Sequence, residues 1–419
     1  MKWSSAHAGK HRMATENIIA ALDIGTTKIV CLVGEMDDEQ RIYVIGHGEA
    51  PAEGLKRGIV VDMEKTVGSI RRAVDDAQMI SGTEIDRVTA GIAGEHIRSI
   101  NSHGVIAVSR SDQEITAHDV RRAIDAARAV AIPVDRETIH VIPQNFSVDD
   151  QGGIKDPVGM SGVRLELEAH IVTASVTSAK NIYRALERCH LSVDHMVLES
   201  LALSQVLLTD SELELGVIVV DVGGDITNMS VFYDGAIRYT GVISLGAKNV
   251  TSDIAIGLRT SVDQAERLKT THGAAVASMA DPEEMVTVAG AVGRPDREVS
   301  RNVLASIIEP RMEEIFSLVM REIKKVGITD RLAAGIVLAG GGSLLPGAVE
   351  LAEQIFDMQV RTGRIERIEH IPDELDSVRY ATVHGLLRYG FQHEPLPGGK
   401  RGRVRSLLKR FENWITRRF

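Results

Sequence analysis

Two short segments of the sequence have the composition of a phosphate-binding turn. They are Asp23-Ile-Gly-Thr-Thr-Lys28 and Asp221-Val-Gly-Gly-Asp-Ile-Thr227, and each follows a run of apolar residues. Glycine in such a turn lets backbone N–H groups approach phosphate oxygens with no Cβ in the way. The threonine hydroxyls add donors, and Lys28 adds a positive charge suited to a β- or γ-phosphate. Either segment alone is more often a structural turn, but the pair favours a nucleotide site.

Asp23 and Asp221 stand at the ends of the two apolar runs. A buried carboxylate in that position can hold Mg²⁺ through water, because Mg²⁺ keeps much of its hydration shell. Two such turns that face each other would clamp a phosphate tail from both sides. We therefore expect a site for a nucleotide and Mg²⁺ that is built by both halves of the chain.

A third glycine-rich segment, Ala339-Gly-Gly-Gly-Ser343, stands between a strand-like run and a helix-like run. Consecutive glycines let a flat base or a ribose lie against the backbone, with the N-terminus of the following helix facing the phosphates. A flexible strand-to-helix loop would have the same composition. The segment is not a Walker motif, because no Gly-Lys-Ser/Thr follows it.

The elements that must position these turns repeat one plan. Residues 17–23 and 29–33 are predicted to be strands on either side of the first turn. Residues 216–221 and 229–233 repeat that pattern around the second turn, and Asp234-Gly235 then predicts a hairpin turn. The pattern indicates a duplicated α/β domain in which each half opens with a β-hairpin.

Three helices are predicted from apolar spacing and length. The first covers residues 64–80, and the second has the apolar stripe Val120, Ile124, Ala127 and Val130. The third covers residues 299–326, where Pro310 must start a new helix or kink the existing one. Its buried face is expected to carry Val303, Ile307, Ile308, Ile315, Phe316, Val319 and Ile323.

The composition is that of a globular protein, since 44% of the 419 residues are apolar and 25% are charged. This length suits two to four subdomains. Two cysteines exclude a disulfide scaffold and indicate a reducing compartment. The first residues lack the apolar segment of a secretory signal, and no run reaches the roughly 18 apolar residues of a transmembrane helix. We therefore expect a cytoplasmic protein.

The last twenty residues differ in charge from the rest of the chain. Residues 400–419 contain eight Lys or Arg and one Glu, in a chain whose net charge is −10. Wound as a helix, this segment gathers its apolar side chains within an arc of roughly 140°. The pattern predicts an amphipathic helix that lies flat on an anionic membrane. The residues expected to contact the membrane are Val404, Leu407, Leu408, Phe411, Trp414, Ile415 and Phe419, with Arg405, Lys409 and Arg410.

Two other interpretations of this segment are less favourable. A helix docked on the globular body is disfavoured, because the Pro- and Gly-rich linker at residues 391–399 separates the two. An arm that binds nucleic acid is disfavoured by the apolar face, so no nucleic acid is expected as a partner.

The two Asp-x-Gly turns and the strand-Gly-Gly-Gly-helix segment resemble the actin/Hsp70/sugar-kinase superfamily. Within it, the chain is similar to the FtsA family of bacterial cell-division proteins. The resemblance extends from residue 17 to about 390 without a large gap. Lys155-Asp-Pro-Val-Gly159 lies in the inserted region that separates FtsA-like proteins from other actins. Further matching segments are residues 141–146, 179–182, 250–254, 293–295, 308–311 and 333–342.

The resemblance implies a fold of the α/β class, a two-domain actin-like ATPase fold with an inserted α+β subdomain and a C-terminal amphipathic helix. A nucleotide would occupy the cleft between the domains. The implied boundaries are a disordered N-terminus at 1–16, domain 1 at 17–87 and 167–200, the insert at 88–166, domain 2 at 201–390 with a small subdomain at about 245–300, a linker at 391–400 and the membrane helix at 401–419.

The resemblance also implies which residues contact ATP and Mg²⁺. Glu266 and Lys269 match the position where the superfamily reaches adenosine, although a solvated helix face would look the same. Glu199 matches a group that orients the attacking water, with a surface or capping role as the alternative. The other implied contacts are Asp23, Gly25, Thr26, Thr27, Lys28, Asp221, Gly223, Gly224, Thr227, Gly340, Gly341 and Gly342, with Asp23 and Asp221 holding Mg²⁺ through water.

The implied function is that of an adaptor for cell division. An ATP-loaded body would recruit the C-terminal peptide of the tubulin-like FtsZ ring to the cytoplasmic face of the inner membrane at the division site. There it would also self-associate and meet other division proteins. Arg294, Arg297 and Arg301 are candidates for contacting the acidic peptide, with an ordinary solvated basic face as the alternative.

The second turn departs from the family pattern of three glycines, two threonines and an aspartate. It has Asp225, Ile226 and Asn228 instead, and a carboxylate close to a triphosphate is unfavourable unless something relieves it. This predicts a nucleotide that is bound but hydrolysed slowly or not at all. The rival functions are an FtsA-related pilus-assembly protein, which lacks the basic helix, and an actin-fold kinase or phosphatase, which has no use for it.

Overall fold

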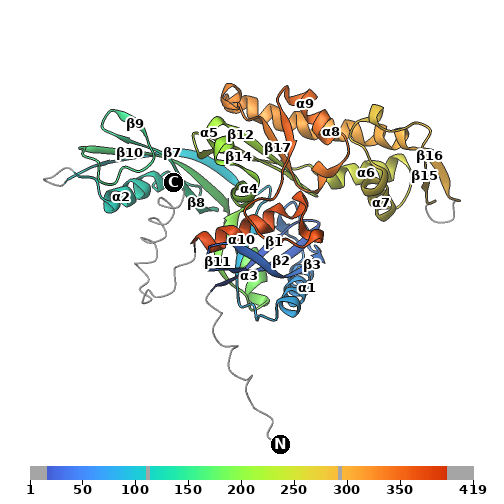
Figure 1. Ribbon diagram of the computed structural model, residues 1–419, viewed down its shortest axis with the longest axis horizontal. Helices are drawn as coiled ribbons and strands as arrows, with labels where there is room; N and C mark the ends of the chain where they lie inside the picture. Colours follow the sequence, from blue (N-terminus) through green and yellow to red (C-terminus); the bar gives the residue numbers. More distant parts are fainter. Residues whose placement is uncertain (1–16, 110–113, 291–294, 394–419) are drawn as a thin grey trace, which may run out of the picture.

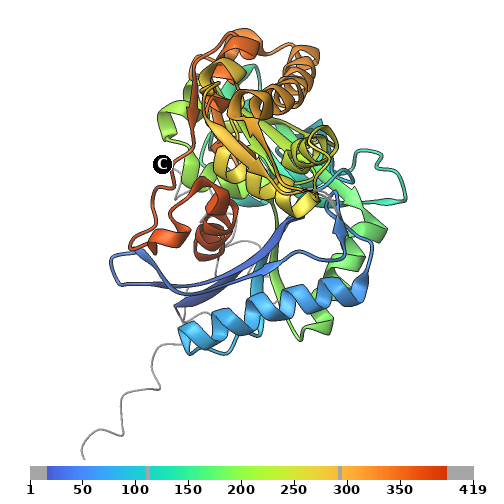
Figure 2. The same cartoon turned by 90° about the vertical axis from the view of Figure 1, so that its right-hand side faces the viewer.

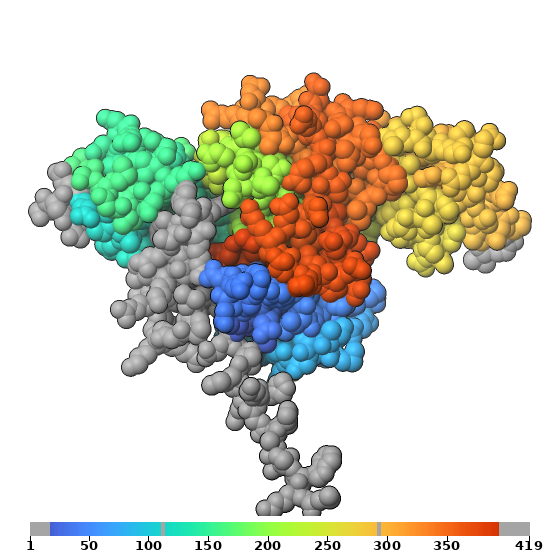
Figure 3. Space-filling view, viewed as in Figure 1, coloured from blue at the N-terminus to red at the C-terminus, as the bar shows by residue number. Residues whose placement is uncertain are grey.

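The computed structural model describes residues 17–109, 114–290 and 295–393. The predicted N-terminal segment, Arg294 and the predicted membrane helix lie outside these ranges. Two α/β domains form the centre of the described part, with one smaller lobe projecting at each end (Figure 1). In the space-filling view, the green and teal lobe at one end is the inserted subdomain, and the yellow lobe at the other end is the small subdomain (Figure 3). The expected arrangement of two α/β domains with an inserted subdomain is present.

The first domain contains a five-stranded sheet. Its central hairpin is antiparallel, and two parallel strands extend it on one side. Asp23 lies next to the end of the first hairpin strand, opposite Val30. In order across the sheet, the strands are β11 (Ser192–Leu198), β6 (Arg87–Ile92), β1 (Ile18–Ile24), β2 (Lys28–Met36) and β3 (Ile42–Pro51).

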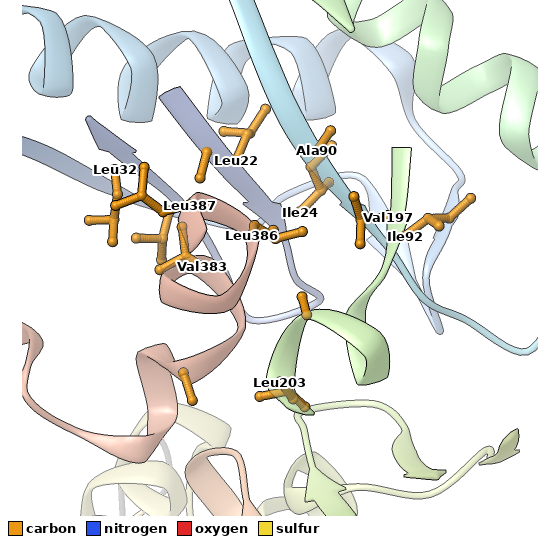
Figure 4. Packing of buried hydrophobic residues seen from close by; sticks show 14 of the residues in the cluster. Leu22, Ile24, Leu32, Ala90, Ile92, Val197, Leu203, Val383, Leu386 and Leu387 are labelled. Carbon is orange, nitrogen blue, oxygen red and sulfur yellow. The ribbon is translucent and has the colours of Figure 1, made fainter. Parts of the chain in front are cut away.

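Two helices cover the opposite faces of this sheet, α1 (Met63–Ser81) and α10 (Ala381–His393) (Figure 2). Leu386 and Leu387 of α10 are completely buried, and Leu387 lies beside Leu32 of the hairpin (Figure 4). The last described helix is therefore part of the core of the first domain, although the chain reaches it only after building the second domain.

The second domain repeats the plan of the first. Its order is β14 (Ala236–Ile243), β13 (Thr227–Tyr233), β12 (Val217–Val222), β17 (Ile336–Ala339) and β18 (Val360–Thr362). The first three strands are antiparallel and the last two extend the sheet in parallel. Asp221 is next to last in β12, as Asp23 is in β1. The predicted duplication is therefore confirmed.

The inserted lobe is a four-stranded antiparallel sheet with one helix on its face. The sheet has the order β7 (Arg98–Ala107), β10 (Arg164–Ser175), β8 (Arg136–Val148) and β9 (Gln151–Ile154). The helix is α2 (Ala117–Arg128), whose buried residues include Val120 and Ala127. Val130 lies two residues beyond its end, so it is not part of the apolar stripe of the helix, contrary to the prediction.

The small lobe lies between β14 and the long helix α8 (Arg301–Val326). It contains α6 (Ala247–Gly257), α7 (Val262–His272) and the hairpin of β15 (Met285–Val288) and β16 (Arg297–Ser300). Helix α8 continues through Pro310, so of the two predicted outcomes no new helix starts there, because the face around Ile308 and Met312 is held in the core. One detail of the sequence prediction is wrong here. Val303 is 47% exposed, since it lies in the first turn, before that face is covered.

The remaining helices complete the two domains. In the first domain α3 (Val176–Arg188) and α4 (Glu199–Leu207) flank β11, and in the second α5 (Asp210–Leu215) and α9 (Ala348–Phe356) accompany the sheet. Over the described ranges, no helix has the length and apolar content needed to cross a membrane.

Candidate nucleotide-binding site

The two Asp-x-Gly turns lie in contact with each other. The turn between β1 and β2 carries Thr26, whose Oγ1 accepts a hydrogen bond of 3.1 Å from the backbone N–H of Asp225 in the turn between β12 and β13. A Cβ on Gly224 would lie only 2.1 Å from Oγ1 of Thr27. A side chain at position 224 would therefore displace Thr27, and glycine there lets the two predicted phosphate segments lie face to face.

The third glycine-rich segment packs beside the second turn. Gly340 follows β17 with a φ of 78°, and a Cβ there would lie 2.4 Å from Oδ1 of Asp221. Gly341–Leu344 forms a short 3₁₀ helix, η3, before α9 begins. The glycines thus let the backbone approach Asp221 closely, and all three predicted segments converge on one place between the domains.

Three carboxyl groups are buried at this place. Asp23, Asp221 and Glu199 are each less than a tenth exposed. Burial raises the pKa of Asp23 to about 7, the nearby Lys28 ammonium opposes that rise, and the charge of Asp221 adds to it. Burial, followed by the charges of Asp23 and Asp221, raises the pKa of Glu199 well above its usual value. Glu199 is therefore buried within the acidic cluster, and the alternative of a surface role is wrong.

Asn228 holds one member of this cluster. Its Nδ2 donates a hydrogen bond of 3.2 Å to Oδ2 of Asp221. Burial raises the pKa of Asp221 and this hydrogen bond opposes the rise, because it stabilises the ionised carboxylate. An amide at 228 therefore supports the charged form of Asp221.

Lys28 is directed toward α10. Its Nζ lies 3.2 Å from the centre of the Tyr380 ring and 3.9 Å from Oε2 of Glu49, and it has no hydrogen-bond partner in the described part of the chain. The Tyr380 hydroxyl donates to Glu49 at 2.8 Å. Burial, together with the charge of Arg379, lowers the pKa of Lys28 to about 7. A buried ammonium without a hydrogen-bond acceptor is suited to receive an anion.

Glu266 and Lys269, the residues expected near adenosine, lie on α7, and Lys269 connects this helix to α6. Lys269 is buried, and its Nζ donates to Oε2 of Glu266 at 2.7 Å and to Oγ1 of Thr251 at 2.9 Å. The first turn of α6 is tied to the second phosphate turn, because the N–H of Ala247 donates to the carbonyl of Gly223 at 2.9 Å. Glu266 and Lys269 therefore lie on α7, which is bonded to the helix that adjoins the second turn, and Lys269 is not part of a solvated face.

Comparison with known proteins decides the family. The family model described as "Cell division protein FtsA" matches residues 218–385, and the one described as "SHS2 domain inserted in FTSA" matches residues 94–173. The Pseudomonas aeruginosa protein named cell division protein FtsA is 46% identical over 377 residues, which cover 90% of each chain. The chain belongs to the FtsA family.

A second relative and the solved structures agree with this assignment. The FtsA of Neisseria meningitidis is 42% identical over 96% of this chain and 99% of its own. The structure titled "PilM-PilN type IV pilus biogenesis complex" matches 91% of this chain and 99% of its own with a TM-score of 0.66, and MreB5 of Spiroplasma citri bound to ADP matches 95% and 99% with a TM-score of 0.55. Their identities of 15% and 12% show a shared actin-like fold and no more.

The FtsA-family chain uses a residue at the second turn that the sequence analysis missed. Nζ of Lys248, in the first turn of α6, donates to the carbonyl of Thr26 at 2.6 Å and lies 3.0 Å from Oδ1 of Asp225. This ion pair compensates the negative charge of the Asp225 carboxylate beside the phosphate turns. No local pattern indicates this role, because Lys248 and Thr26 belong to different domains.

Two of the three arginines expected to contact an acidic peptide are bonded within the small lobe. Arg301 pairs with Glu284 at 2.9 Å and donates to the carbonyl of His272 at 2.9 Å. Arg297 donates to the carbonyl of Leu258. Arg294 lies outside the described residues. The structure thus places Arg297 and Arg301 in contacts that hold the lobe together.

The three turns present the groups that a nucleoside polyphosphate and Mg²⁺ require. Threonine hydroxyls and glycine backbone match the needs of phosphate, Lys28 Nζ has no hydrogen-bond acceptor although it lies over Tyr380 and near Glu49, and the carboxylates of Asp23 and Asp221 match the needs of hydrated Mg²⁺. Among the described residues, no three His, Cys, Asp or Glu side chains are arranged to bind a metal directly. These residues fit a nucleoside polyphosphate with Mg²⁺, provided that the contacts between the two turns open to admit it.

Proposed function

We propose that this FtsA-family protein binds ATP with Mg²⁺ between its two domains. One observation carries the proposal: the glycine turns that end β1 and β12 lie in contact, with Asp23 and Asp221 buried behind them. The MreB5 of similar fold is described as bound to ADP, which supports an adenine nucleotide as the ligand.

In this proposal each turn supplies one side of the phosphate site. Thr26 and Thr27 donate from the first domain, and the backbone of Gly223 and Gly224, with Thr227, forms the wall from the second. Asp23 and Asp221 hold the hydrated Mg²⁺, which neutralises phosphate charge when it is bound. The Gly340–Gly342 segment and the pair of Glu266 and Lys269 adjoin the nucleoside.

A titration with a fluorescent ATP analogue tests this site. The wild type is expected to bind in the presence of Mg²⁺, and Thr26→Val with Thr27→Val is expected to weaken binding at least about tenfold, since two hydrogen bonds to charged phosphate are lost. Ser252→Ala on the exposed side of α6 is the matched control. Equal affinity of the double variant and the control would refute the proposed contacts.

Turnover is expected to be slow. Asn228 and Ile226 supply neither a carboxylate nor a hydroxyl, and Glu199 is buried with a raised pKa, which favours its protonated form over that of a base. Purified protein should release phosphate more slowly than several times per minute, and a faster rate contradicts this expectation. In that case ATP acts by binding, because it stabilises one conformation of the two domains and is not consumed.

We further propose that the protein anchors the FtsZ ring to the cytoplasmic face of the inner membrane at the division site and self-associates there. Membership of a cell-division family supports a partner in the division machinery. The apolar and basic pattern of residues 401–419, which lie outside the described ranges, supports the membrane as the second partner.

Co-sedimentation with anionic liposomes tests the anchor. The full chain should pellet with the liposomes and carry FtsZ with it, while a chain ending at Gly399 should stay in the supernatant. Phe411→Glu with Trp414→Glu should behave like the truncation, and Thr416→Glu, on the polar side of the predicted helix, is the control. Pelleting of the truncated chain would show that the tail is not the anchor.

A further inference from the structure

The carboxylate of Asp225 joins three segments that are distant in the sequence. Its Oδ2 accepts a hydrogen bond of 3.1 Å from the backbone N–H of Arg57, and its Oδ1 lies 3.0 Å from Nζ of Lys248. Its own N–H donates to Thr26, as described above. Arg57 is the tip of a small hairpin between β4 (Leu55–Lys56) and β5 (Ile59–Val60) in the first domain. Asp225 thus ties the second domain to two loops of the first.

Lys248 completes this junction from the second domain. Its Nζ contacts the carbonyl of Thr26 at 2.6 Å, so the ammonium lies against the first phosphate turn. Its N–H donates to the carbonyl of Gly224 at 2.9 Å, which fixes the start of α6 to the second phosphate turn. The side chain is 45% exposed. This ammonium is therefore in contact with both turns and remains accessible to a ligand.

Lys28, the cation that the sequence analysis expected at the phosphates, is engaged elsewhere. Its Nζ lies over the Tyr380 ring and beside Glu49, on the α10 side of the first turn. By contrast, Lys248 is held at the point where the two turns meet. The geometry therefore offers Lys248 to an anion that enters between the turns.

We propose that Lys248 is a phosphate-binding residue of the nucleotide site and that Asp225 is its exchangeable counterion. This inference rests on the proposed nucleotide function. Without nucleotide, Asp225 neutralises Lys248 and links the two domains through Arg57 and Thr26. A polyphosphate carries several negative charges, so it replaces the single carboxylate of Asp225 as the partner of Lys248. The contacts that Asp225 makes with Arg57 and Thr26 then break.

The charges predict effects of opposite sign at the two positions. Removing the charge of Asp225 takes away repulsion toward phosphate and frees Lys248, so nucleotide affinity rises. Removing the charge of Lys248 leaves Asp225 unpaired beside the phosphates, so affinity falls. A purely structural bridge predicts lower stability for both variants and no such opposition.

The test is a titration of the full-length protein with a fluorescent ATP analogue in Mg²⁺. Asp225→Asn is expected to lower the Kd at least about tenfold, and Lys248→Met to raise it at least about tenfold, as expected for charge interactions of this range. Lys248→Arg keeps the charge and should stay close to the wild type. High salt should reduce both differences.

A matched ion pair away from the site provides the control. Lys325 and Glu322 pair at 2.6 Å on α8, so Lys325→Met and Glu322→Gln should leave the Kd unchanged. Thermal unfolding of each variant separates a local change in affinity from loss of folding. If Lys248→Met melts early, Lys248→Gln and the Asp225→Asn variant still decide the sign.

Hydrogen exchange without nucleotide tests the link between the domains independently. The N–H of Arg57 should exchange faster in Asp225→Ala than in the wild type, because its acceptor is gone. If the wild type binds the nucleotide and both Asp225→Asn and Lys248→Met bind it with the same Kd as the wild type, the proposed role of Lys248 is wrong. The nucleotide proposal then still holds. Failure of the wild type to bind any adenine nucleotide refutes the nucleotide proposal, and the role of Lys248 falls with it.

Discussion

Asp23, Asp221 and Glu199 bring three carboxyl groups into one buried region, and this governs the behaviour of the site at the residue scale. Three charges cannot all be accommodated there without a cation, since burial disfavours each ionised form. Burial raises the pKa of all three carboxyl groups, so each protonated form is favoured more than it would be in an exposed carboxyl group. A bound cation such as Mg²⁺ would favour the ionised forms instead.

This cluster predicts a pH dependence of stability. The pKa of Asp23 is about 7 in the folded chain and about 3.8 when unfolded, so between these values the folded state binds the extra proton. The nucleotide-free protein should lose stability from this group as pH rises from about 4 to 7, and Asp23→Asn should flatten the slope. The lowered pKa of Lys28 affects stability at higher pH, between about 7 and 10.5. There the unfolded chain binds the extra proton, so the contribution of Lys28 to stability rises with pH.

Urea unfolding at several pH values in that range measures the slope. Asp263→Asn, on the exposed start of α7, is the control and should leave it unchanged. A slope that is the same in wild type and Asp23→Asn would contradict a protonated cluster.

At the scale of elements, the strand-to-helix connection after β17 depends on glycine at one position and tolerates a side chain at the next. Gly340 has positive φ and no room for a Cβ beside Asp221, whereas a Cβ on Gly341 would meet nothing within 4 Å. Adjacent residues in one segment thus have different requirements, which the run of three glycines does not reveal.

Alanine at these two positions should therefore have different effects. Gly340→Ala should lower the free energy of unfolding by roughly 1–3 kcal/mol, because strain and a close contact with Asp221 are added. Gly341→Ala should be nearly neutral. Chemical denaturation measures both, and equal effects would show that the backbone at 340 is not held as described.

At the scale of the whole molecule, the inserted lobe is attached to the second domain through side chains that bind the edge of its sheet. Gln144 Nε2 donates to the carbonyl of Ile237 at 2.7 Å, and Asn101 Nδ2 donates to that of Arg238 at 3.1 Å. Ring nitrogens of His170 lie 2.7 Å from Oδ1 of Asn101 and 3.3 Å from Oγ1 of Thr240. Side-chain bonds of this kind cover the edge of β14 without extending its sheet.

Removing these donors should loosen the lobe. Gln144→Ala with Asn101→Ala should cost about 0.5–1.5 kcal/mol per hydrogen bond and speed hydrogen exchange along β14. Gln151→Ala, exposed on β9 of the same lobe, is the control. Unchanged exchange along β14 in the double variant would mean that Gln144 and Asn101 do not hold the lobe against this strand.

The sequence by itself determined the local plan of this protein. Glycine and aspartate at the ends of apolar runs specify hairpin turns, and two such hairpins predict the duplicated domains. These features depend on backbone sterics and side-chain period within a few neighbouring residues, so they can be read without a structure. The same holds for the family, which the matched segments indicated before the comparisons confirmed it.

Only the tertiary structure decided the partners of individual side chains. Lys28 contacts Tyr380, Asp225 pairs with Lys248, and Arg301 bonds within its own lobe. Each of these contacts joins segments that the packing of sheets and helices brings together, and a short sequence pattern contains no information on that packing. The turns could therefore be located from the sequence, while the charges that act within them depend on how the two domains meet.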